Sequence, residues 1–78
     1  MPAHGEPRNF WQWLRQQVSR DDAIGDLARD AIHDTTFPRR ARRESVIRDY
    51  LYQCNACEGA HTALSAGFRE WRRSTVKQ

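Results

Sequence analysis

No run of apolar residues in this sequence is long enough to span a bilayer, which takes about 20 residues. The N-terminus also lacks the basic-then-apolar order of a signal peptide. Only two cysteines are present, which is poor material for a structural disulfide framework and does not argue for secretion. These absences predict a cytoplasmic protein without membrane contact.

Internal repeats, low-complexity tracts and interdomain linkers are missing as well. The 78 residues leave room for one domain, which buries roughly 60% of the surface that its unfolded form exposes. Pro2, Gly5 and Pro7 without periodicity predict a flexible leader over residues 1–8, and we expect residues 75–78 to fray. The expected domain therefore covers residues 9–74.

Helical periodicity is the strongest pattern in the sequence. The clearest set of apolar residues at helical spacing forms a stripe along one side of an amphipathic helix. We expect Ser19 to cap this helix and Phe37 and Pro38 to stop it. The apolar residues of the stripe are Ile24, Leu27, Ala28, Ala31 and Ile32. A first helix is expected from a cap at Asn9 to about residue 18. A third is expected over residues 42–53, or from residue 39 if Pro38 lies near its first position, and a fourth from a cap at Asn55 to about residue 74. The predicted fold class is all-α, a compact four-helix bundle.

Aromatic and small residues supply the predicted core. Gly25 inside a helix predicts a close neighbour, because glycine costs a helix about 1 kcal/mol relative to alanine. Trp11 either covers the edge of the core, which we prefer, or is an exposed contact residue. The other expected core positions are Phe10, Trp13, Leu14, Val18, Val46, Ile47, Tyr50, Leu51, Cys54, Ala60, Ala63, Leu64, Gly67, Phe68 and Trp71.

Several segments of the sequence form a recognisable set, namely Trp11–Leu14, Ala31–Asp34 followed by Phe37–Pro38, Tyr50–Leu51 in the third helix and an aromatic-rich fourth helix. Together they resemble the YozE family of small bacterial proteins. The resemblance covers roughly residues 9–73 and implies a four-helix bundle similar to sterile alpha motif (SAM) domains. It implies no established activity and carries over no catalytic residues. Nucleic-acid binding has been suggested for the family by analogy of fold, but fold does not decide function.

Charge is distributed unevenly along the chain, although a net charge of +3 is too small to name a partner. Asp22, Asp26, Asp30 and Asp34 recur every fourth residue and predict an acidic row on one helix. The best functional signal is an arginine cluster, Arg39, Arg40, Arg42 and Arg43, with Arg69, Arg72 and Arg73 as an extension.

The arginines predict a non-enzymatic module that binds DNA or RNA through phosphates, without sequence preference and with strong salt dependence. The alternative is a protein-interaction or self-association module that uses the acidic row, Asp22 to Asp34, against the basic face. A chain this short leaves little room for both a core and a preorganised pocket, so neither catalysis nor a small-molecule substrate is expected.

Cys54, Cys57 and His61 have the spacing of a zinc knuckle, since two thiolates and an imidazole are zinc ligands. The fourth ligand would have to be His33 or His4. The preferred interpretation is a buried pair of thiols, because free cysteine behaves as a small apolar residue. No metal and no cofactor are therefore predicted.

Overall fold

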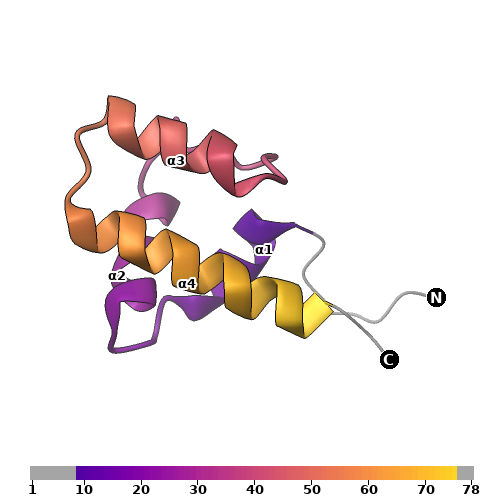
Figure 1. Cartoon of the computed structure of the whole chain (residues 1–78). Helices are drawn as coiled ribbons and strands as arrows, with labels where there is room; N and C mark the ends of the chain where they lie inside the picture. Colours follow the sequence, from indigo (N-terminus) through magenta and orange to yellow (C-terminus); the bar gives the residue numbers. More distant parts are fainter. Residues whose placement is uncertain (1–8, 76–78) are drawn as a thin grey trace.

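Four α-helices and a short 3-10 helix make up the computed structural model, which describes residues 9–75 (Figure 1). The helices are α1 (Phe10–Leu14), α2 (Ala23–Ile32), α3 (Glu44–Gln53) and α4 (Glu58–Thr75), and the 3-10 helix η1 (Arg15–Gln17) directly continues α1. The described part of the chain contains no strand. The all-α prediction is confirmed, whereas the predicted leader and residues 76–78 of the predicted tail lie outside the described residues.

The longest helix, α4, is the element against which the other helices pack. It contacts α1, α2 and α3. Figure 1 shows α3 running in the opposite direction to α4, so that the start of α3 lies beside the later part of α4. Glu44, the first residue of α3, accordingly accepts a hydrogen bond of 3.1 Å from Ser65 of α4.

Two of the three helix caps expected from the sequence differ from those in the structure. Asn9 caps α1 as predicted, because its side chain accepts a hydrogen bond of 2.9 Å from the Gln12 amide. The predicted cap at Ser19 is wrong. Asp22 caps α2 instead, and its carboxylate accepts a hydrogen bond of 2.9 Å from the Gly25 amide. A carboxylate at this position also interacts favourably with the positive end of the helix.

Asn55 ends α3 and does not cap α4, so that prediction is wrong too. It is the only non-glycine residue with a positive φ in the described chain, at 57°. The Asn55 amide donates to the Tyr52 carbonyl at 3.1 Å, and the Ala56 amide donates to the Leu51 carbonyl at 3.0 Å. This is the Schellman pattern, in which a left-handed residue such as asparagine satisfies the last carbonyls of a helix.

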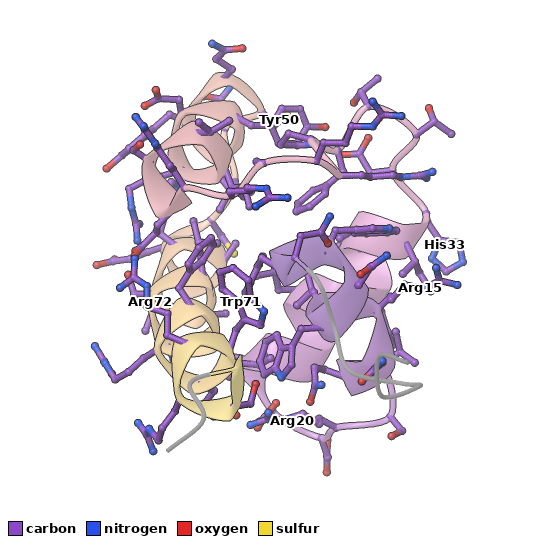
Figure 2. The ribbon with its side chains drawn as sticks, turned by 90° about the vertical axis from the view of Figure 1, so that its right-hand side faces the viewer. Arg15, Arg20, His33, Tyr50, Trp71 and Arg72 are labelled. Carbon is purple, nitrogen blue, oxygen red and sulfur yellow. The ribbon has the colours of Figure 1, made fainter. Side chains whose placement is uncertain are left out.

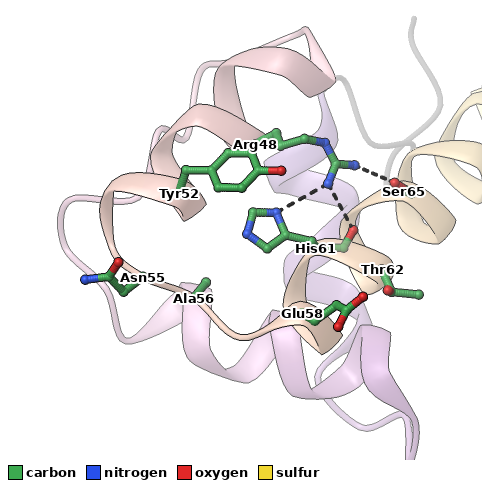
Figure 3. Close-up of a pocket in the computed structure, with 8 residues that line it drawn as sticks. All are labelled: Arg48, Tyr52, Asn55, Ala56, Glu58, His61, Thr62 and Ser65. Carbon is green, nitrogen blue, oxygen red and sulfur yellow. Dashed lines mark hydrogen bonds between the residues drawn. The ribbon is translucent and has the colours of Figure 1, made fainter.

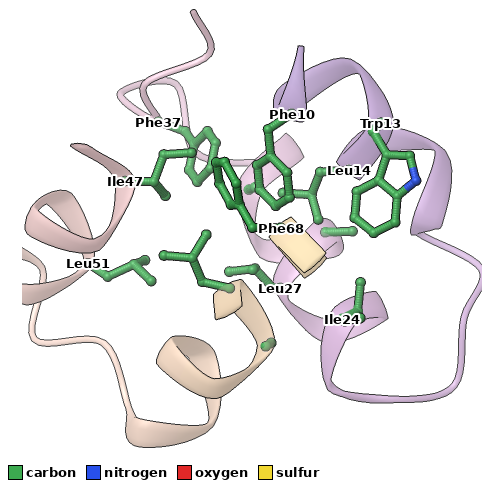
Figure 4. Close-up of a cluster of buried hydrophobic side chains, with 13 residues drawn as sticks. Phe10, Trp13, Leu14, Ile24, Leu27, Phe37, Ile47, Leu51 and Phe68 are labelled. Atoms are coloured by element: carbon green, nitrogen blue, oxygen red, sulfur yellow. The ribbon is translucent and has the colours of Figure 1, made fainter. Parts of the chain in front are cut away.

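The core is built on stacked rings between α1 and α4 (Figure 4). Phe10 and Phe68 are fully buried, and their ring centroids lie 4.2 Å apart. The fully or nearly buried side chains are Phe10, Trp13, Leu14, Ile24, Leu27, Ala28, Ala31, Phe37, Ile47, Leu51, Ala63, Leu64 and Phe68. Trp11 packs against this cluster from its edge, as the preferred interpretation predicted.

The stripes on α2 and α3 are narrower than predicted. Ile32 is 37% exposed and Val46 is 45% exposed. Ile32 is the last residue of α2, and Val46 lies in the first turn of α3, where Ile47 and Leu51 alone point fully inward. Both misplaced residues therefore sit near helix ends, where fewer neighbouring elements cover them.

Gly25 has the close neighbour that its position in α2 predicted. A Cβ atom built on it would lie 2.0 Å from the backbone oxygen of Arg20. The chain entering α2 therefore passes against the first turn of this helix, which no side chain at position 25 would allow.

Candidate functional site

The arginine-rich segment between α2 and α3 consists of two consecutive tight turns. The Phe37 amide donates to the Asp34 carbonyl at 3.2 Å, and the Ala41 amide donates to the Pro38 carbonyl at 3.2 Å. Phe37, between these two turns, is buried against Trp11 and Tyr50. We call residues 39–43 the arginine loop. Its first two arginines occupy the centre of the second turn, and Phe37 anchors its start to the core.

Asp34 and Tyr50 hold the base of this loop. The Tyr50 hydroxyl donates to the Asp34 carboxylate, which also accepts from the amide and the hydroxyl of Thr36. The hydrogen bond from Tyr50 is the main cause of the lowered pKa of Asp34, and the same bond raises the pKa of Tyr50 to about 12. The ionised carboxylate thus ties the end of α2 to α3 on either side of the arginine loop.

This arrangement predicts an acid-sensitive contribution of Asp34 to stability. A carboxylate with a lowered pKa stabilises the fold above its unfolded pKa of about 4, and this stabilisation is lost as the pH falls through the folded value. Asp34→Asn should therefore be less stable than the wild type in urea unfolding at neutral pH, with a difference that shrinks below about pH 4. Asp30→Asn, an exposed position one turn earlier in α2, is the control. A difference for Asp34→Asn that stays constant down to about pH 2 would contradict this role.

The four arginines of the loop are exposed and form no ion pair in the described chain. Arg39, Arg40, Arg42 and Arg43 are all exposed, and none of them takes part in an ion pair with a described residue. Arg39 lies over the Trp11 ring, with its guanidinium carbon 4.9 Å from the ring centroid. The loop therefore presents concentrated positive charge that the rest of the described chain does not neutralise through ion pairs.

Three arginines outside the loop form ion pairs. Arg20 bridges Asp22 and Glu70 at 2.8 Å each, Arg29 pairs with Asp26, and Arg48 pairs with Glu44 at 2.6 Å. Arg29 also donates to the carbonyls of Val18 and Arg20. These three arginines have structural partners. Arg15 and Arg69 are exposed without an ion pair in the described chain, as the loop arginines are, so the loop differs from them in gathering four such arginines within residues 39–43.

The start of α3 adds to the positive potential of the loop. Its first residue is Glu44, two residues later than predicted, and the alternative start at Arg39 is wrong. Arg43 is the N-cap residue, but its side chain forms no capping hydrogen bond. The positive end of the helix macrodipole thus points toward Arg42 and Arg43. Glu44 supplies one negative charge in this first turn, and its carboxylate is paired with Arg48.

Of the three α4 arginines predicted to extend the cluster, Arg72 acts electrostatically on the first residue of α3. Arg48 and Ser65 hydrogen-bond the Glu44 carboxylate and lower its pKa, and the positive charge of Arg72 adds to this effect. Arg72 therefore lies near Glu44, the residue that follows Arg43. Figure 2 shows Arg72 on the side of α4 below α3 and away from Trp71, which faces α1. Arg69 is exposed on α4, whereas Arg73 lies near Glu70.

Most side chains of the predicted acidic row form hydrogen bonds or ion pairs within the molecule. Asp22 caps α2 and pairs with Arg20, Asp26 pairs with Arg29, and Asp34 binds Tyr50 and Thr36. Asp30 is exposed. The role of the row as a partner-binding surface stays a prediction, and three of its four members already have internal partners.

Cys54, Cys57 and His61 do not gather into a metal site. The described residues contain no cluster of three or more His, Cys, Asp or Glu side chains placed to hold a metal ion. The expected burial of the two thiols is wrong, because both cysteines are exposed. Cys54 lies on the predicted stripe, but it is the C-cap residue of α3, at the peripheral turn into α4 (Figure 1). His4, the other suggested ligand, lies outside the described residues.

An open polar pocket of about 570 Å³ lies between the end of α3 and the start of α4 (Figure 3). Arg48 spans its wall, donating to Ser65, to Nδ1 of His61 at 3.3 Å and to the His61 carbonyl at 3.4 Å. The Tyr52 ring packs on the His61 ring, with centroids 4.4 Å apart. Because Arg48 already engages Nδ1 of His61 and Ser65 binds Glu44, these groups brace α3 on α4 and form no nucleophile and base pair. Sequence reasoning did not predict this brace.

The architecture defines a small, all-helical, SAM-like domain. Residues 9–72 match the family model described as YozE SAM-like fold. The chain belongs to this family. No curated protein and no solved structure matches the chain in the corresponding searches. None of the described helices is both long and apolar enough to cross a membrane.

Proposed function

We propose that this protein is a non-enzymatic binding module that contacts nucleic-acid phosphates through the arginine loop. The observation that carries the proposal is that residues 39–43 hold four exposed arginines, none of which forms an ion pair in the described chain. Guanidinium groups bind phosphate oxygens through paired hydrogen bonds. A cytoplasmic location is part of the proposal, since such a partner is available there.

The shape of the site favours contact with the backbone over the reading of base edges. The loop arginines stand in a turn and at a helix N-cap, so no helix carries them as a row into a groove. Arginine contacts to phosphates fix position but carry no sequence information. Binding is therefore expected to be independent of sequence and to weaken steeply with salt.

The test measures the affinity of a labelled DNA duplex over a series of salt concentrations. Arg40→Ala/Arg42→Ala/Arg43→Ala should lose affinity at least tenfold at about 50 mM salt. Because each phosphate contact contributes about 0.9 to the slope of log affinity against log salt, the slope should fall by about 3.

A charge-matched control variant distinguishes the effect of the loop arginines on binding from the effect of the protein's net charge. Ser19→Glu/Ala23→Glu/Gln53→Glu lowers the net charge by the same three units at exposed positions outside the arginine loop. This variant should keep the wild-type slope and most of the affinity. Equal losses of affinity in the two triple variants would mean that binding depends on net charge and not on the arginine loop, which would contradict the proposal. A wild type that does not bind even at low salt would refute the proposal. Sizing runs without nucleic acid test the alternative of self-association.

A further inference from the structure

Trp11 and Arg39 form a stacked pair beside the unpaired arginines. Trp11 is half-buried near the start of α1, with its ring centroid 5.5 Å from that of the buried Phe37. The exposed Arg39 lies over the Trp11 ring with its guanidinium carbon at 4.9 Å. The tryptophan is thus supported by the core on one side and covered by a planar cation on another.

Arg39 differs from its neighbours in the loop because a carboxylate lies near it. The pKa of Asp34 is lowered mainly by Tyr50 and Thr36 and, in smaller part, by the positive charge of Arg39. This carboxylate weakens the attraction of Arg39 for a phosphate, although Arg39, like Arg40, Arg42 and Arg43, forms no ion pair in the described chain. The geometry therefore separates a planar stacking group from three phosphate-binding groups within one short loop.

We propose that the Trp11 and Arg39 pair is a stacking site for an unpaired nucleobase, so that the preferred ligand is single-stranded nucleic acid. This inference rests on the proposed function and deepens it. Bases stack on aromatic rings and on guanidinium planes, and every base has a face suited to this contact. In a duplex these faces are hidden by neighbouring pairs, so only a single strand can use the pair while its phosphates meet Arg40, Arg42 and Arg43.

The proximity of the two groups suits a short stretch of strand. Arg39 and Arg40 are the two central residues of the Pro38–Ala41 turn, and Arg42 and Arg43 lead from this turn into α3. A nucleotide stacked on Arg39, or on Trp11 after Arg39 moves aside, has its own and the adjacent phosphates next to the other arginines. The base and the backbone of the same strand are thus bound together.

The test compares four labelled probes with matched phosphate numbers at low salt. They are a DNA strand and an RNA strand of about 12 nucleotides, an abasic strand of the same length, and a duplex. The wild type should bind the DNA or the RNA strand about tenfold more tightly than the abasic strand and the duplex. The ratio of the affinities for the DNA strand and the RNA strand shows which of the two nucleic acids the site prefers.

Variants of the stacked pair give a second readout. Trp11→Leu keeps apolar packing on Phe37 but removes the ring, and Arg39→Lys keeps the charge but removes the guanidinium plane. Both should lose the preference for strands with bases over the abasic strand while retaining the salt-dependent binding of the duplex. Thermal unfolding of both variants verifies that the fold is intact. Arg40→Ala/Arg42→Ala/Arg43→Ala should instead weaken binding of all four probes.

The outcomes separate this inference from the proposed function. Equal affinity of the wild type for all four probes would overturn the stacking site and leave the phosphate contacts standing. An undiminished preference for strands with bases in folded Trp11→Leu and Arg39→Lys would also overturn it. Failure of the wild type to bind any probe at low salt would overturn the proposed function itself, and this inference with it.

Discussion

Replacing Gly25 by alanine is expected to destabilise the protein by about 3 kcal/mol, although the same change in most helix interiors stabilises by up to about 1 kcal/mol. The Cβ atom would lie 2.0 Å from the Arg20 carbonyl oxygen and 2.8 Å from its carbon, which are both backbone atoms. Arg20 cannot move without cost, because Arg29 donates to its carbonyl at 3.0 Å and its own side chain bridges Asp22 and Glu70.

Thermal unfolding of three glycine variants tests this explanation. Gly25→Ala should lower Tm by about 15 °C. Gly59→Ala is the matched control, because its Cβ would meet only the Cys57 sulfur at an ordinary 3.8 Å, and it should raise stability by about 0.5 kcal/mol. Gly67→Ala, with Phe10 and Trp13 atoms at 3.3–3.4 Å, should lie between them. A stabilised Gly25→Ala variant would show that the chain entering α2 shifts freely.

The helical framework could be predicted because it depends on local patterns. The apolar residues of α2 and the aromatic residues of α4 recur at the spacing that places them on one side of a helix. The predicted stop at Phe37 and Pro38 is wrong, because α2 ends at Ile32 and a separate turn joins Asp34 to Phe37. The choice among capping residues could not be predicted in the same way. Ser19 and Asp22 both have capping side chains, and the contacts of Arg20 and Arg29 with the chain entering α2 distinguish them only in the folded structure.

The candidate site was predicted in part. Runs of arginine indicate exposed charge, and the loop arginines are exposed as expected. Two features of the site depend on how distant segments of the chain pack, and residue spacing within one segment cannot predict them. They are the proximity of Arg72 to Glu44 and the stacking of Arg39 on Trp11. The exposure of Cys54 shows the same limit, because a stripe position is buried only where another element covers it.

Phe68→Ala is expected to cost about 4 kcal/mol of the free energy of unfolding. The Phe68 ring is fully buried, stacks on Phe10 at 4.2 Å and meets the edge of Trp71 at 5.4 Å. It therefore joins the middle of α4 to α1, a helix of only five residues that gains its stability from packing. Removing the ring loses its transfer free energy and leaves a cavity that the rigid neighbouring rings fill poorly.

Urea unfolding followed by circular dichroism measures this effect. A chain of this length has a total stability of about 4 to 12 kcal/mol, so Phe68→Ala should remove between about a third and all of it. Phe68→Leu retains most of the volume and should cost less than about 1.5 kcal/mol. Thr62→Ala, at an exposed position on the same helix, should change stability by less than about 0.5 kcal/mol. If Phe68→Ala lost no more than Phe68→Leu, the joint between α1 and α4 would have to lie elsewhere, and Phe10 would then be the residue to replace.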